Sequence, residues 1–260
     1  MNVLLLTDYS ATAHHAHKYA FNLFSAKKQV NYFLLHSCHQ IDNEAKEQNN
    51  EFKLKKDLKA LNQLTAGKSY ITPICSPKRL IDAIRECLKN HDIDLVVMGA
   101  NGHSNNLTHQ LGKNAKSTAT KIKCPVLIVF NNCAIKIPHK VAFPVDYTDR
   151  LQESCIKKIK KLPASDQLEI DVFEINRNST DSFLEENSKS ILHRGLEKLK
   201  TSYVKDVNFN ISTLKTKDNS SFDLISFAAK NLSVNHIIFD QLRELNSTFN
   251  NHPPLYILHA

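Results

Sequence analysis

Three of the five glycines of this chain fall between residues 99 and 112, directly after a short apolar run and before a lysine-bearing segment that predicts a helix. Glycine permits a positive φ and close approach of a ligand to the backbone, and the N-terminus of a helix favours an anion. From Leu95 to Phe130 there is no Asp or Glu, but there are four lysines, Lys113, Lys116, Lys121 and Lys123. These residues favour binding of a phosphate group. The alternative is a strand-to-helix turn beside a solvated lysine face.

The glycine spacing differs from two common phosphate-binding motifs. It is not the GxxxxGK[ST] of the P-loop, because Asn114 follows Gly112-Lys113 and no glycine stands five positions before Gly112. It is not the dinucleotide motif GxGxxG either. Asp8, which follows the first apolar run, could bind Mg²⁺ together with a nucleotide, or it could cap the helix that begins near Ser10. Both roles of Asp8 stay open at this point.

The glycine segment lies in a chain that alternates between short apolar runs and amphipathic stretches, a pattern that predicts βαβ units. In the first half we predict strands near residues 2–7, 29–37, 69–75, 94–98 and 125–130. Helices are predicted between them, near residues 10–24, 42–66, 78–90 and 111–122. Val126–Val129 is continuously apolar, as in strands that are buried on both faces. The sequence therefore predicts an α/β fold with a parallel sheet and helices on both faces.

The second half of the chain repeats landmarks of the first. Three segments recur in the same order, at offsets of 138, 141 and 129: Val3–Ser10 as Val141–Thr148, Ile93–Met98 as Val234–Phe239, and Pro125–Val129 as Pro254–Leu258. We predict an internal duplication, with domains at residues 1–132 and 138–260. The second copy would then be 12 residues shorter before its last strand, with Phe239-Asp240 in place of Met98-Gly99. We expect this degenerate domain to lack the glycine loop and to be closed to nucleotide.

Composition limits the class of protein. The 260 residues, 42% of them hydrophobic, suffice for two packed cores, which excludes global disorder, and no apolar run is long enough to span a bilayer. The N-terminus lacks the features of a signal peptide and the six cysteines include no CxxC pair, so we expect free thiols and a cytoplasmic location. The net charge of +8 resides mostly in residues 1–130, which carry 17 basic and 10 acidic side chains. Aromatic residues are not interleaved with these lysines, so we expect no nucleic-acid partner.

Three other segments could suggest different chemistry. His14–His17 resembles part of the HxGH signature of adenylyl-transfer enzymes, but Ala16 stands in place of the glycine, so we expect a solvent-facing helix turn. His36–His39 contains candidate zinc ligands, but alternate residues of a strand point to opposite faces, so we expect ordinary packing at a strand end. The charges of residues 42–66, Asp57 among them, are mixed in sign and predict a solvated face.

The order of these features resembles the universal stress protein family. The features that match the first two strands are Asp8-Tyr9-Ser10 after the first and Leu34–His36 at the end of the second. Those that match later are Met98–Gly102, which nine residues separate from Gly112, and Cys124–Val129, which closes the sheet. The resemblance covers the first half and, more weakly, the second. It implies a tandem member with two five-stranded parallel sheets, helices on both faces of each, in the adenine-nucleotide alpha-hydrolase-like, Rossmann-like class. The ATP-binding branch of the family carries G-x2-G-x9-G-[ST]; the three glycines match this spacing, and Lys113 replaces the hydroxyl residue.

The resemblance also implies a set of nucleotide-binding residues. The set consists of Asp8, His36, Ser37, Gly99, Gly102, Gly112, Lys113 and Asn114. By resemblance, Asp8 would lie beside the adenosine, the end of the second strand would meet the adenine edge, the first two glycines would border the ribose and phosphates, and the amides at the helix start would receive the phosphates. Loss of the hydroxyl at Lys113 removes one hydrogen bond, worth about 0.5–1.5 kcal/mol, although the lysine ammonium could act as a point charge on phosphate.

We therefore predict a cytoplasmic stress-response regulator that binds ATP, ADP or AMP in its first domain as a ligand-dependent switch, with Mg²⁺ as a companion ion of the nucleotide. No motif assembles a nucleophile with a base, so we expect no enzyme beyond slow, incidental ATP hydrolysis. The alternative is an interaction scaffold of the same fold that binds no nucleotide. Expected partners are the adenine nucleotide and proteins that the sequence does not identify, with no membrane. The two domains are expected to pack as an internal pseudo-dimer, and by resemblance the chain could also form a homodimer.

Overall fold

The computed structural model describes residues 1–38, 44–65, 69–102, 111–148, 151–163, 167–175, 182–197, 199–206, 222–230, 234–235, 238–239 and 252–259. The chain divides into two compact units. The first consists of residues 1–108 and 112–135, and the second of residues 109–111 and 136–260. Each unit contains five parallel strands, as the α/β prediction requires.

Strands and helices alternate through the first unit. They are β1 (Asn2–Leu6), α1 (Ala11–Leu23), β2 (Asn31–Ser37), α2 (Glu44–Leu64), β3 (Tyr70–Ser76), α3 (Leu80–His91), β4 (Leu95–Gly99), α4 (Lys113–Lys121) and β5 (Val126–Val129). Their order in the sheet is β3-β2-β1-β4-β5. Every element predicted for this half is present, with its ends within about two residues of the prediction, the usual uncertainty of element boundaries. The continuously apolar β5 is buried throughout, because helices cover both faces of the sheet.

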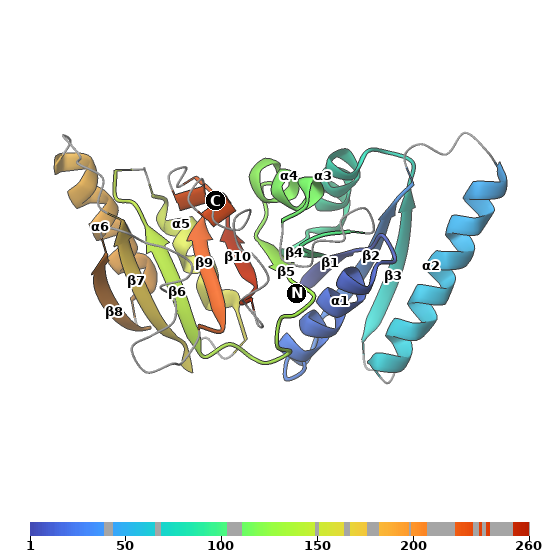
Figure 1. Cartoon of the computed structure of the whole chain (residues 1–260), viewed down its shortest axis with the longest axis horizontal. Coiled ribbons are helices and arrows are strands. Elements are labelled where there is room, and N and C mark those ends of the chain that lie inside the picture. Colours follow the sequence, from blue (N-terminus) through green and yellow to red (C-terminus); the bar gives the residue numbers. More distant parts are fainter. Residues whose placement is uncertain are drawn as a thin grey trace. The chain divides into compact units, whose positions relative to one another are not determined.

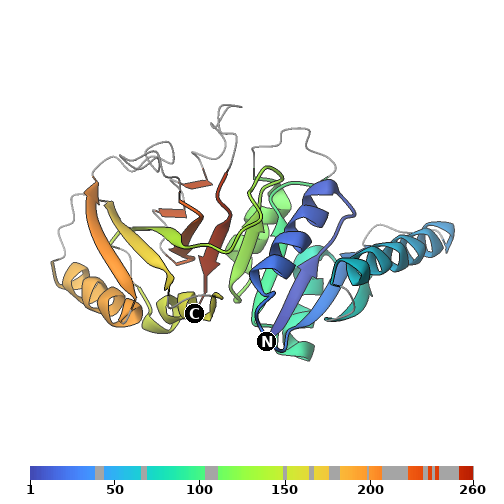
Figure 2. The same ribbon diagram turned by 90° about the horizontal axis from the view of Figure 1, so that it is seen from below.

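The strand order determines which helices cover which face. The chain steps outward from β1 to β2 and β3, then crosses back to β4 and β5. Right-handed crossovers therefore place α1 and α2 on one face and α3 and α4 on the other. Figure 1 shows α3 and α4 together, and Figure 2 shows α1, in dark blue, along the strands. The order reverses between β1 and β4, and ligands of open α/β sheets bind beyond the carboxyl ends of the strands at such a point.

The second unit repeats this topology with shorter helices. Its elements are β6 (Lys140–Val145), α5 (Glu153–Ile156), the 3₁₀ helix η1 (Lys157–Lys161), β7 (Glu169–Ile175), α6 (Ser182–Leu196), β8 (Lys200–Asp206), β9 (Leu224–Ala228) and β10 (Leu255–Leu258). The strand order β8-β7-β6-β9-β10 corresponds to β3-β2-β1-β4-β5. Among the described residues, no helix combines the length and apolar character needed to cross a membrane.

The register of the two sheets supports the predicted duplication. The pairing of β1 with β2 recurs in β6 and β7 at an offset of 138. The pairing of β4 with β5 recurs in β9 and β10 at an offset of 129, so that Met98↔Ile128 corresponds to Phe227↔Ile257. The pairing of β2 with β3 recurs in β7 and β8, where β7 keeps the offset of 138 and β8 has an offset of 130. Most of the fall in offset from 138 to 129 therefore arises between β7 and β8. The second copy is therefore shorter around α6.

The predicted fourth strand of the second copy at Val234–Phe239 is wrong. That strand is β9, and the described residues 234–235 and 238–239 are helical. A six-residue segment with four apolar residues fits a helix turn as well as a strand, and periodicity alone does not separate them. The predicted loss of 12 residues is therefore also wrong, because the segments that join β4 to β5 and β9 to β10 have the same length. Ala228 corresponds to Gly99, and Asp240 lies outside the described residues.

Candidate functional site

The end of β1 turns sharply into α1 through Asp8, Tyr9 and Ser10. Tyr9 has a positive φ of 63°, and its N–H donates to the Thr7 hydroxyl at 3.0 Å. The Ser10 N–H donates to Asp8 Oδ1 at 3.1 Å, and the Ser10 hydroxyl caps α1 by accepting from the Ala13 N–H at 3.1 Å. Short-range side-chain bonds of this kind hold turns. Asp8 thus organises the turn, while its side chain remains exposed.

The glycines after β4 allow close approach between this turn and the neighbouring chain. A Cβ at Gly102 would lie 2.2 Å from Asp8 Oδ2, and a Cβ at Gly99 would lie 2.8 Å from Thr12 Cγ2. Neither glycine has a φ in the left-handed region, so lack of space rather than positive φ is the reason for glycine here. The predicted residues Asp8 and Gly102 are therefore in contact, whereas Gly99 packs against the first turn of α1.

The end of β2 lies beside the same turn. Nδ1 of His36 is 3.0 Å from the Thr7 carbonyl oxygen, and the His36 and Tyr9 rings lie 4.5 Å apart at their centroids. Burial raises the pKa of the Tyr9 phenol well above its usual range, so this side chain is neutral at physiological pH. The Ser37 hydroxyl donates to the Lys78 carbonyl at 2.8 Å. His36 and Ser37 are thus held in place at the predicted adenine edge.

The N-terminus of α4 corrects one predicted role. The Gly112 N–H donates to the Ala100 carbonyl at 2.8 Å, so this amide is already hydrogen-bonded within the protein. A Cβ at Gly112 would lie 3.3 Å from that carbonyl oxygen, which explains the glycine by close packing. The N-cap residue of α4 is Gly112, which has no side chain to cap the helix, and helices leave their first N–H groups without intrahelical acceptors. Lys113 and Asn114, both exposed, therefore supply the amides that an anion could use.

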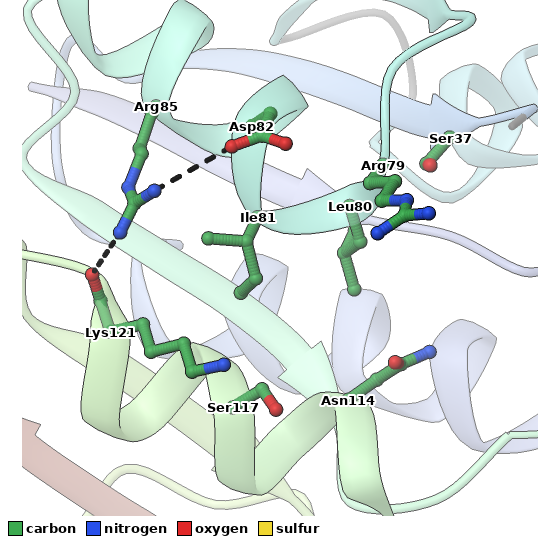
Figure 3. Close-up of a pocket in the computed structure, with 9 residues that line it drawn as sticks. All are labelled: Ser37, Arg79, Leu80, Ile81, Asp82, Arg85, Asn114, Ser117 and Lys121. Carbon is green, nitrogen blue, oxygen red and sulfur yellow. Dashed lines mark hydrogen bonds and ion pairs between the residues drawn. The ribbon is translucent and has the colours of Figure 1, made fainter.

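A pocket of about 750 Å³ lies between α3, α4 and the end of β2 (Figure 3). Its lining residues are Ser37, Arg79, Leu80, Ile81, Asp82, Arg85, Asn114, Ser117 and Lys121. Two predicted residues, Ser37 and Asn114, therefore share one pocket, although they are far apart in the sequence. Figure 3 shows Leu80 and Ile81 between the two helices. The other predicted residues, Asp8, His36, Gly99, Gly102, Gly112 and Lys113, do not line it.

The basic side chains of this pocket were not predicted from the sequence. Arg79 precedes α3, and Arg85 lies one turn into that helix, where its guanidinium is 3.5 Å from Asp82 Oδ1 and donates to the Lys121 carbonyl at 3.4 Å. Lys121, at the end of α4, was predicted only as one of four lysines that favour a phosphate group. The sequence places Arg79 just before the helix that follows the third strand, but a single basic residue there has no distinctive spacing. In this topology that position faces the edge where ligands bind.

A polar cluster links α2 to α1 and to the end of β1. Asp57 of α2 is 4% exposed, accepts a hydrogen bond from the Thr7 hydroxyl at 3.0 Å, and pairs with Nε2 of His14 on α1. The predicted solvated face is therefore wrong for Asp57. Leu54, Asp57 and Leu61 form one buried helical stripe, and this spacing was the signal that the charge pattern obscured.

The predicted solvent-facing turn at His14–His17 is also wrong. His17 is fully buried, with Nε2 3.0 Å from the Leu6 carbonyl oxygen, and His15 Nε2 lies 2.7 Å from that of Cys133. Burial lowers the pKa of His17 to about 4, because the charged imidazolium would lose its hydration. His17 thus fixes α1 against β1, and His15 fixes it against the segment after β5. In the described part of the chain, no cluster of three or more His, Cys, Asp or Glu side chains could hold a metal ion.

The second unit contains the same turn in a buried form. Asp146 Oδ1 accepts from the Thr148 N–H at 2.9 Å and from its hydroxyl at 2.6 Å, as Asp8 accepts from Ser10. However, Asp146 is completely buried, whereas Asp8 is exposed. The sequence from Ala228 to Pro254 contains no glycine. The expectation of a closed second site therefore rests on a covered carboxylate and missing glycines, not on a shortened loop.

Comparison with known proteins agrees with this fold. The sequence model of the universal stress protein family matches residues 1–129. Over the whole chain, a universal stress protein from Archaeoglobus fulgidus has the same fold, with a TM-score of 0.65, 14% identity, and coverage of 99% of this chain and 96% of the other. A putative universal stress protein from Pseudomonas aeruginosa is similar over 99% of this chain and 93% of its own, with a TM-score of 0.54 and 10% identity.

Among functionally curated proteins, none matches the sequence significantly. The two structural relatives span both units of the chain, and at their low identity they show its fold alone. The family match covers all five strands of the first sheet and the glycine spacing after β4. The chain is therefore a member of the universal stress protein family, with the family sequence pattern in its first 129 residues.

Proposed function

We propose that the first domain binds an adenine nucleotide and that binding alters the surface that the protein presents to its partners. The observation that carries this proposal is the shared pocket of Ser37 and Asn114, two residues that family resemblance assigned to opposite ends of the nucleotide. The pocket volume of about 750 Å³ lies within the range of small-molecule sites. Family membership supports the same ligand class.

The residues around the pocket fit a nucleotide. The N-terminus of α4 offers the Lys113 and Asn114 amides, and the helix dipole favours negative charge there. Arg79 adds a guanidinium, which can contact phosphate through two N–H groups. Asp8 offers an exposed carboxylate beside Gly102, where a ribose hydroxyl could donate to it. Phosphates would therefore lie toward α4, and the sugar toward the turn after β1.

We also propose a binding protein rather than an enzyme. Asp8 is already hydrogen-bonded to the turn, and a nucleotide that binds one conformation of the protein more tightly than others would shift the population toward that conformation. Any ATP hydrolysis would be slow and incidental. None of the six cysteines forms a disulfide in the described structure, which favours a reducing compartment, so we propose a cytoplasmic location. A Mg²⁺ ion would reach the site with the nucleotide and use Asp8 as a ligand.

Calorimetric titration of the full chain with ATP, ADP and AMP tests the proposal. We expect about one nucleotide per chain, and a loss of about 10-fold or more in affinity in Arg79→Ala, since a hydrogen bond to a charged group contributes roughly 1.5–3 kcal/mol. Arg194→Ala, which removes the same charge from the second unit, is the matched control. Absence of heat at millimolar nucleotide would refute nucleotide binding and favour the interaction scaffold. Two nucleotides per chain would refute the closed second site.

Two further measurements separate binding from catalysis and from metal binding. Phosphate release from ATP, followed over hours, should not exceed a slow background, and enzyme-like turnover would contradict the binding role. Affinity for ATP should fall when Mg²⁺ is chelated, and this fall should be smaller in Asp8→Asn. Equal dependence on Mg²⁺ in both proteins would remove Asp8 as the metal ligand.

A further inference from the structure

Two cysteine thiols are in contact at the end of the first sheet. Sγ of Cys75 lies 3.3 Å from Sγ of Cys38, although the residues are 37 positions apart in the sequence. Cys75 belongs to β3, and Cys38 directly follows the last residue of β2. The two strands pair in parallel, with His36 opposite Cys75 and Ser37 opposite Ser76. Cys38 is therefore placed diagonally across the strand pair from Cys75.

Access to solvent distinguishes this pair from the other cysteines. Cys75 is exposed and Cys38 is half-buried, whereas Cys87, Cys124, Cys133 and Cys155 are buried. Burial raises the pKa of the Cys87 thiol to about 11 and that of Cys155 to about 12, so neither forms the reactive thiolate readily. A reagent in solution would therefore meet Cys75 first, and the nearest thiol to it would be Cys38.

The local backbone leaves room for a bond between the two sulfurs. A disulfide requires a sulfur–sulfur distance of about 2.05 Å, so the atoms must approach by roughly 1.3 Å. Cys38 lies beyond the paired residues of β2, and its contacts there are an N–H bond of 2.8 Å and a thiol contact of 3.1 Å to the Ser76 carbonyl. A shift of Cys38 alone would therefore leave the paired residues of β2 and β3 in place.

We propose that Cys38 and Cys75 are an oxidisable thiol pair that forms a reversible intramolecular disulfide when it meets a hydroperoxide. The Cys75 thiolate attacks one peroxide oxygen, the oxygen–oxygen bond breaks, and the hydroxide released takes up a proton to become water. Cys75 is then a sulfenic acid. The Cys38 sulfur attacks the Cys75 sulfur, the sulfur–oxygen bond breaks, and a second water leaves with the thiol proton. Two thiols are oxidised, and one hydrogen peroxide is reduced to two waters.

The position of the pair gives the oxidation a structural consequence. Cys38 follows Ser37, whose hydroxyl is bonded to the Lys78 carbonyl just after β3. The Tyr9 and His36 rings lie at the same end of the sheet. A covalent link between the ends of β2 and β3 would restrict this corner of the domain. In a reducing compartment such links are transient and serve as redox signals rather than as structural staples.

Mass spectrometry of the full chain tests the proposal. The reduced protein is treated with hydrogen peroxide, the remaining thiols are alkylated after the protein is denatured, and the intact mass and tryptic peptides are measured. We expect loss of two hydrogen atoms, a cross-linked peptide pair containing Cys38 and Cys75, and full reversal by dithiothreitol. The Cys87 and Cys155 peptides of the same digest should remain alkylated and thus serve as internal controls.

Two single-cysteine variants make the result specific. Cys75→Ser and Cys38→Ser should each abolish the two-hydrogen loss, and far-ultraviolet circular dichroism should show that both variants remain folded. In Cys38→Ser, a sulfenic acid on Cys75 should become detectable with a sulfenic-acid-specific reagent. The proposal is overturned if the wild-type protein shows no cross-linked peptide, if its disulfides are between chains, or if Cys75 proceeds to sulfinic acid while Cys38 stays reduced.

Discussion

The contact between Gly102 and Asp8 provides a sharp test of the nucleotide site. In Gly102→Ala, the added Cβ would lie 2.2 Å from Asp8 Oδ2, far inside van der Waals contact. The φ of Gly102 is outside the left-handed region, so the backbone tolerates alanine, and the strain falls on the carboxylate of the Asp8 side chain. The carboxylate must turn away. We therefore expect a local displacement of Asp8 without unfolding.

The expected magnitude follows from the bond that Asp8 would make to a ribose hydroxyl. A hydrogen bond to a charged group contributes about 1.5–3 kcal/mol, which corresponds to a loss of about 10- to 150-fold in nucleotide affinity. Asp8→Ala should cost about the same, and the double variant should be no worse than either single one, because both substitutions remove one interaction. Calorimetry with AMP on the four proteins measures this cycle.

Two results would refute this reasoning. If Gly102→Ala binds AMP as tightly as the wild type, Asp8 does not contact the nucleotide from its observed position. If the two substitutions add, Gly102 acts on the nucleotide independently of Asp8. Thermal unfolding of the same four proteins shows whether a change in affinity reflects loss of fold instead.

Three further predictions concern stability. Gly99→Ala should destabilise the domain by roughly 1–3 kcal/mol in urea unfolding, because the added Cβ would meet the Thr12 backbone at 3.0 Å. Since the pKa of His17 is about 4 in the folded protein and 6.5 when exposed, the unfolded state binds the proton more tightly. The contribution of His17 to the free energy of unfolding is therefore fully present above pH 6.5 and falls by up to about 3 kcal/mol as the pH drops to 4. This dependence of stability on pH should flatten in His17→Gln but not in His15→Gln. Asp57→Ala should cost about 1–3 kcal/mol, since the buried Thr7 hydroxyl and the partly exposed His14 ring lose their partner, and an unchanged unfolding midpoint would contradict the polar network.

The first half of the fold could be predicted from the sequence because each element carries a strong local pattern. β4 and β5 are continuous apolar runs, and the helices between strands are amphipathic. The sequence pattern predicted exposure wrongly where a polar residue occupies a buried position. Asp57 and His17 are buried because each finds a hydrogen-bond partner in another element, and such partners are set by tertiary structure.

The candidate site was predictable only in part for the same reason. Asp8, Gly102 and Ser37 were identified by resemblance, and the structure shows what each contacts within the chain. The engagement of the Gly112 amide by Ala100 could not be predicted, because it depends on how the segment after β4 folds back on itself. Arg79 was missed because a single basic residue before a helix has no distinctive spacing. Its role depends on the neighbouring α4, which is distant in sequence.

The turns after β1 and β6 both contain an aspartate, and their comparison shows which part of the first aspartate's role needs a ligand. Asp8 and Asp146 make the same bond to the residue two positions later, and only Asp8 is exposed. The bond within the turn therefore accounts for an aspartate in both units without any ligand. Among the described residues, what distinguishes the first unit is an exposed carboxylate against a glycine, Asp8 beside Gly102. The aspartate alone is thus explained by the fold, and the case for nucleotide binding rests on the shared pocket of Ser37 and Asn114, supported by Asp8, Gly102 and the start of α4.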